Sequence, residues 1–110
     1  MSDLRVIYTT LPNIKTAQKI SNQLLSESLI ACSNILPGML SSYFWKAKVV
    51  QEKEVILLCK TTKKLALKAF KRIEFLHPYQ VPCLYMLNPS RTSKKYTLWL
   101  QEVFSESRKR

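Results

Sequence analysis

The order in which the spacing of apolar residues changes along the chain constrains the fold more than any other feature. Short β-branched or alternating stretches are typical of strands, whereas apolar residues recurring every three or four positions indicate helices with one buried face. Strands are predicted at 4–10, 29–45, 49–60 and 81–87, and helices at 14–29, from Thr61 or Thr62 to about 76, and after Ser93. The order is strand, helix, strand, strand, helix, strand, with an additional C-terminal helix.

This order predicts an α+β fold, the ferredoxin-like βαββαβ sandwich in which two helices cover one face of an antiparallel sheet. We find no internal boundary or repeat, so a single domain over residues 1–110 is expected. The second and third strands exceed the usual length of about 5 to 6 residues, and Pro37-Gly38 predicts a bulge or bend in the second. Their ends are expected to overhang and expose unpaired edges, which symmetric assembly would cover.

Composition excludes several functional classes. The only glycine is Gly38, which rules out the glycine-rich loops that bind nucleotide phosphates. No apolar stretch approaches the roughly 20 residues needed to span a bilayer, and the first residues lack the pattern of a signal peptide, so we expect a mature chain that begins near Met1. The three cysteines, Cys32, Cys59 and Cys83, are widely spaced and odd in number, which favours reduced thiols and a cytoplasmic location.

The net charge of +11 could attract nucleic acid, an anionic membrane or an acidic protein, or could belong to a solvated surface. The basic residues between 60 and 72 are distributed around a predicted helix, which favours a solubilising surface. Several aromatic residues could stack on bases, but the chain lacks the glycine- and aromatic-rich motif of RNA-binding folds with this topology. We therefore do not expect nucleic acid to be the partner.

Candidate chemical groups are few. His77 is the only histidine, and no nucleophile or carboxylate stands near it in a triad pattern, so it is either a structural residue at a helix end or a ligand. Cys32 is either a small buried residue, a thiol ligand or a redox thiol. Glu52 and Glu54 share one strand face and are expected to be solvated. Neither an enzyme active site nor a complete metal site is expected within one chain.

Several motifs together resemble the CutA family of divalent-cation tolerance proteins. They are residues 31–38 (ACSNILPG), 42–45 (SYFW), 60–61 (KT) and 77–82 (HPYQVP), followed by 96–100 (YTLWL) near the C-terminus. The resemblance covers nearly the whole chain in the same element order. It implies a single CutA-like domain that forms a tight homotrimer through its long strands, similar in architecture to the PII signalling proteins.

The resemblance also implies a function and a set of candidate ligands. It links the chain to tolerance of copper and other divalent ions, and, through animal relatives connected with acetylcholinesterase, to a possible protein partner. It implies no enzymatic reaction and no organic cofactor. Copper binding in bacterial relatives involves a Cys and a His that correspond to Cys32 and His77, which are our predicted metal ligands.

Three positions depart from the family pattern. A further family Cys corresponds to Thr9, which removes a soft donor and weakens a copper assignment. Ala47 replaces a hairpin glycine, and Thr92 replaces the glycine before the final motif. The predicted function is a non-enzymatic, cytoplasmic homotrimer that binds copper or another divalent cation in clefts between copies. The alternative is a PII-like signalling or anchoring module whose clefts bind a small ligand or a partner protein.

Overall fold

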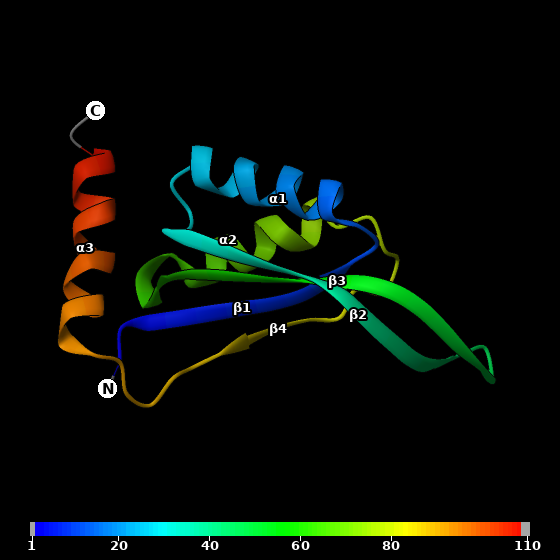
Figure 1. Cartoon of the computed structure of the whole chain (residues 1–110). Coiled ribbons are helices and arrows are strands. Elements are labelled where there is room, and N and C mark those ends of the chain that lie inside the picture. The colour runs from blue at the N-terminus through cyan, green and yellow to red at the C-terminus, as the bar shows by residue number, and fades with distance from the viewer. Residues whose placement is uncertain (1, 109–110) are drawn as a thin grey trace.

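Four antiparallel strands form one sheet in the order β2-β3-β1-β4, and two helices cover one of its faces (Figure 1). The computed structural model describes residues 2–108, with the side chains of 106–108 excepted. The elements are β1 (Leu4–Leu11), α1 (Ile14–Ser26), β2 (Cys32–Trp45), β3 (Lys48–Thr62), α2 (Lys63–Leu76), β4 (Leu84–Leu87) and α3 (Lys94–Arg108). The predicted α+β class and element order are confirmed.

Local sequence signals account for most element boundaries. Asn13 caps α1, because its side-chain oxygen accepts a hydrogen bond of 2.8 Å from the backbone N–H of Thr16. The helix ends at Ser26, earlier than predicted, because Ser28 adopts a left-handed conformation with φ 57° that reverses the chain. β4 begins at Leu84 instead of 81, since Pro82 has no N–H to contribute to the ladder.

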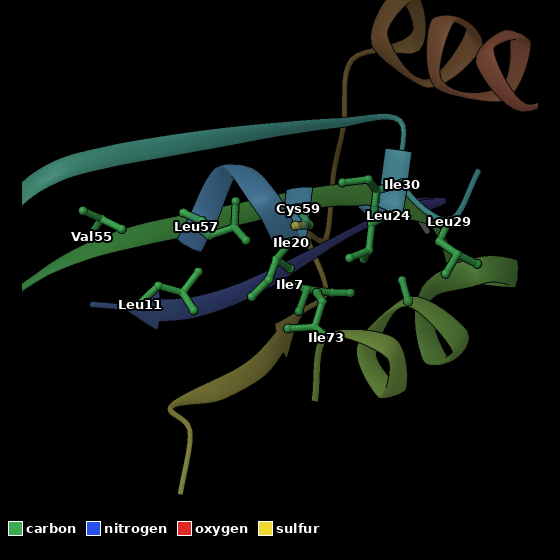
Figure 2. Close-up of a cluster of buried hydrophobic side chains, with 12 residues drawn as sticks. Ile7, Leu11, Ile20, Leu24, Leu29, Ile30, Val55, Leu57, Cys59 and Ile73 are labelled. Atoms are coloured by element: carbon green, nitrogen blue, oxygen red, sulfur yellow. The ribbon is translucent and has the colours of Figure 1, made fainter. Parts of the chain in front are cut away.

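The main core lies between the sheet and the two covering helices. Ile7, Leu24, Leu57 and Ile73 come from four different elements and are all fully buried there (Figure 2). Cys59 shares this core, and burial raises the pKa of its thiol to about 12. A smaller cluster around Leu100 packs α3 against the end of the sheet where β1 begins. None of the helices in the described residues is long and apolar enough to cross a membrane.

The hairpin of β2 and β3 extends well beyond the rest of the sheet (Figure 1). β1 pairs with β3 only from Val55 to Thr62, so residues 39–54 form a two-stranded arm with no third strand. The predicted bulge is confirmed between Leu36 and Met39, where the register shifts. The arm raises the radius of gyration to 15.0 Å, whereas a compact domain of about 100 residues has roughly 13 Å.

The tip of the arm is a two-residue turn in which both residues adopt a strained left-handed backbone conformation. Lys46 and Ala47 have φ values of 50° and 66°, the type I′ geometry that favours glycine at the second position. Ala47→Gly is therefore expected to raise the free energy of unfolding by about 0.5 to 1 kcal/mol. Glycine relieves the left-handed strain at this position, and the greater conformational entropy of glycine in the unfolded chain offsets part of that gain. Urea denaturation measures this change; a lower midpoint would contradict the turn geometry.

Candidate functional site

His77 ends α2 and is held at both ring nitrogens. Nε2 lies 3.0 Å from the carbonyl oxygen of Thr10 and 2.9 Å from Oγ1 of Thr9, and Nδ1 lies 3.2 Å from the backbone nitrogen of Tyr79. The Thr10 carbonyl can only accept and the Tyr79 N–H can only donate, so the proton is on Nε2 and the Nδ1 lone pair is occupied. The imidazole therefore ties the α2–β4 loop to the end of β1.

The surroundings of His77 favour its neutral form. The side chain is only 9% exposed, and burial lowers its pKa below the ordinary value, opposed by the hydrogen bond to the Thr10 carbonyl and by the charge of Glu54. Neutral imidazole is also the form that binds metals, but here its available lone pair already accepts a hydrogen bond. A metal could bind His77 only if the contact with the Tyr79 N–H were broken.

Thr9, the residue at the family's Cys position, has a structural role of its own. Its hydroxyl donates to the carbonyl oxygen of Cys83 at 2.8 Å and faces Nε2 of His77. It is fully buried and lies on β1 between Ile7 and Leu11. The hydroxyl thus links β1 to the segment before β4 and to the imidazole at the same time. A thiol is a weaker donor and acceptor than a hydroxyl in that arrangement.

Cys32 begins β2 at the opposite end of the sheet from the arm. It is half-buried, and its Sγ lies 3.5 Å from the Oη of Tyr96 on α3. The ammonium group of Lys60 lies 5.9 Å from the centroid of the Tyr96 ring. Burial, followed by the hydrogen bond with Cys32, raises the pKa of Tyr96 to about 12, so the phenol remains protonated. Cys83, in contrast, is exposed.

One copy of the chain does not bring Cys32 and His77 together. Ser33 contacts Ser21 of α1, so the preceding residue, Cys32, points to the face opposite the helices. His77 binds Thr9, which lies on the helix-covered face with Ile7 and Leu11. Among the described residues, no group of three or more His, Cys, Asp or Glu side chains could hold a metal ion. A site that uses both predicted ligands must draw donors from different copies.

A second polar contact lies at the base of the arm. The phenol of Tyr79 donates to Oε2 of Glu54 at 2.7 Å, and the Tyr79 ring packs 5.0 Å from the His77 ring. Burial first and Glu54 second raise the pKa of Tyr79. Glu52 is exposed as predicted, but Glu54 is only 7% exposed, so its assignment to a solvated strand face was wrong. Its buried carboxylate depends on a residue 25 positions away, which strand alternation does not reveal.

Known proteins match this chain over most of its length. The family model for the CutA1 divalent ion tolerance protein matches residues 5–103. The divalent-cation tolerance protein CutA of Thermus thermophilus is 39% identical over 97 residues, covering 88% of this chain and 94% of its own.

Solved structures agree in fold as well as in sequence. CutA1 from Ehrlichia chaffeensis has a TM-score of 0.89 at 33% identity, covering 94% of this chain and 97% of its own. A periplasmic divalent cation tolerance protein CutA from Archaeoglobus fulgidus has a TM-score of 0.85 at 28% identity, covering 92% and 98%. The chain therefore belongs to the CutA1 family of divalent ion tolerance proteins.

Proposed function

We propose that this protein acts in divalent-cation tolerance as a non-enzymatic homotrimer. The observation that carries the proposal is the arm of residues 39–54, which has no third strand in one copy. An isolated two-stranded hairpin is marginally stable in water, so an arm of this length needs a surface to pack against. It carries five exposed apolar side chains: Leu40, Tyr43, Phe44, Trp45 and Val49.

The rest of the sheet supports the same proposal. β2 and β4 are edge strands whose outer backbone groups are unpaired within the sheet. On the face opposite α1 and α2, the ring of Tyr8 stacks on the ring of Tyr85 with 4.7 Å between their centroids. The same face exposes Leu36 (44%), Tyr85 (44%) and Leu87 (45%). If the β2 edge of one copy contacts the β4 edge of the next, the interface is head-to-tail. Such an interface closes into a ring when successive copies are related by a closed rotation, such as a threefold axis. Three copies would cover these surfaces.

Copper or another divalent cation is the proposed ligand, held between copies with Cys32 and His77 as donors and without an organic cofactor. The two residues do not fit a metal within one copy, because they face opposite sides of the sheet. Thiolate and imidazole together suit soft or borderline ions. The free cysteines support a reducing, cytoplasmic location, although one relative is described as periplasmic.

The metal proposal is tested by zinc and copper titration of the untagged protein. His77 is the only histidine, so its imidazole Hε1 gives a single proton resonance that reports binding without any mutation. We expect metal to shift that resonance, with no more than one ion per copy, and Cys32→Ser to weaken binding about tenfold, since a thiolate donor is lost.

Cys83→Ser is the matched control, because Cys83 is exposed and is not a proposed donor. It is expected to leave the affinity unchanged. An unmoved His77 resonance together with equal affinity in the two cysteine variants would reject this ligand pair. Assembly without metal binding would instead favour a module that binds a small ligand or a partner protein.

A further inference from the structure

The outward side of the two covering helices is strongly basic. α1, α2 and Glu27, which follows α1, together carry seven basic residues and only two acidic ones, Glu27 and Glu74. The basic residues are Lys15, Lys19, Lys63, Lys64, Lys68, Lys71 and Arg72. All six lysines are exposed, and we call this surface the basic face. α1 and α2 lie together on one face of the sheet (Figure 1). Tyr8 follows the buried Ile7 on β1 and therefore faces the other side, with Tyr85, so the proposed assembly leaves the basic face open.

Two large apolar side chains protrude from the basic face. Leu67 is 61% exposed and Phe75 is 79% exposed, the largest exposed fraction among the large hydrophobic residues described. They stand eight residues apart on α2 with Lys71 midway, so all three lie along one side of the helix. Neither belongs to a core cluster. Their positions are not explained by packing within the chain.

Phe75 is also held in a defined position. The guanidinium of Arg72 lies 5.6 Å from the centroid of its ring, and the same guanidinium donates two hydrogen bonds, of 2.9 and 2.8 Å, to the carboxylate of Glu27. The ring borders a shallow hollow of about 330 Å³ that is also lined by Leu29, Lys68 and Lys71, together with the paired Glu27 and Arg72. The hollow therefore presents two lysine ammonium groups beside an exposed aromatic ring.

This combination fits an anionic membrane surface better than nucleic acid. Its cationic groups are mostly lysine ammonium groups, and its single arginine is paired with Glu27. Leu67 is aliphatic and cannot stack on a base, whereas leucine and phenylalanine both gain from entering the boundary between headgroups and acyl chains. Clustered basic residues add attraction to anionic lipid headgroups.

We propose that the basic face is a peripheral docking surface for anionic phospholipid membranes. Lys68 and Lys71 contact headgroup phosphates at the hollow, while Leu67 and Phe75 insert between the headgroups. The surrounding lysines add long-range attraction. This binding does not depend on metal and does not span the bilayer.

The experiment measures co-sedimentation of the full chain with vesicles of phosphatidylcholine alone or with about one-third phosphatidylserine. Binding is expected only to the anionic vesicles. Lys68→Glu/Lys71→Glu is expected to weaken it by about tenfold or more, and Leu67→Ser/Phe75→Ser by about tenfold. Since Debye screening shortens from about 10 Å at 0.1 M salt to about 3 Å at 1 M, binding should fall with salt in the wild type.

Lys94→Glu/Lys95→Glu is the matched control, because both lysines are exposed at the start of α3 and the net charge changes by the same amount. It is expected to bind within about twofold of the wild type. Insertion is checked separately with Phe75→Trp and brominated lipids, whose acyl chains should quench the added fluorescence. Absence of binding to anionic vesicles, equal loss in the two lysine pairs, or an unquenched tryptophan would overturn the proposal; so would tighter binding to RNA than to the vesicles.

Discussion

Phe44→Thr/Val49→Thr is expected to dissociate the assembly into single chains at micromolar concentration. The two side chains are partners in the β2–β3 ladder and are 78% and 67% exposed in one copy. Burying a phenylalanine or valine side chain contributes about 1.5 to 3 kcal/mol, so the double replacement removes several kcal/mol per copy. Threonine is β-branched and forms favourable cross-strand pairs, so the hairpin itself should persist. Analytical ultracentrifugation measures the result.

The matched control for this variant is Leu67→Thr. Leu67 is 61% exposed but lies on the outer side of α2, away from the arm. Its replacement should leave the mass of the assembly unchanged. If the control dissociated as readily as the arm variant, or if the arm variant remained fully assembled, the arm would not be the contact surface.

His77→Ala is expected to lower the free energy of unfolding by about 3 kcal/mol or more. The change leaves the carbonyl of Thr10 and the N–H of Tyr79 without the imidazole partner, and each unsatisfied buried group costs about 1 to 3 kcal/mol. It also opens a cavity in a site where the native side chain is 9% exposed. Cys32→Ala, which changes a half-buried side chain, is expected to cost less. Chemical denaturation of the three proteins measures both effects.

The same imidazole predicts a pH dependence. Burial lowers the pKa of folded His77 below its unfolded value of about 6.5, so unfolding takes up a proton between those two values. The free energy of unfolding should therefore be at its full value above pH 6.5 and decrease as the pH falls toward the folded-state pKa. Because the chain has one histidine, His77→Gln should remove this component. An identical pH profile in that variant would contradict a buried neutral imidazole.

The sequence was sufficient to predict the architecture because its determinants are local. The change in the spacing of apolar residues located all seven elements, and Pro37-Gly38 located the bulge. Two boundaries were misjudged, at Ser28 and at Pro82. On α3, Leu100 and Phe104 are buried, whereas Trp99 is 41% exposed. The helix packs against the end of the sheet, a surface that only the fold creates.

The candidate site was less predictable because its contacts join residues far apart in sequence. His77 could be singled out as the only histidine, yet its link to Thr9 spans 68 positions and its tautomer depends on the Thr10 carbonyl. The Glu54 contact with Tyr79 was not predicted, because alternation along β3 indicates a face and not what covers it. Cys32 and His77 remain predicted ligands, now with the requirement that different copies supply them.

The proposed functional unit contains three copies of the chain. Sedimentation equilibrium of the unmodified protein at low micromolar concentration, with and without a metal chelator, measures this. We expect a single species with three times the 12.8 kDa mass of the chain in both conditions, because apolar surfaces and strand edges drive the assembly. A monomer at that concentration would contradict it.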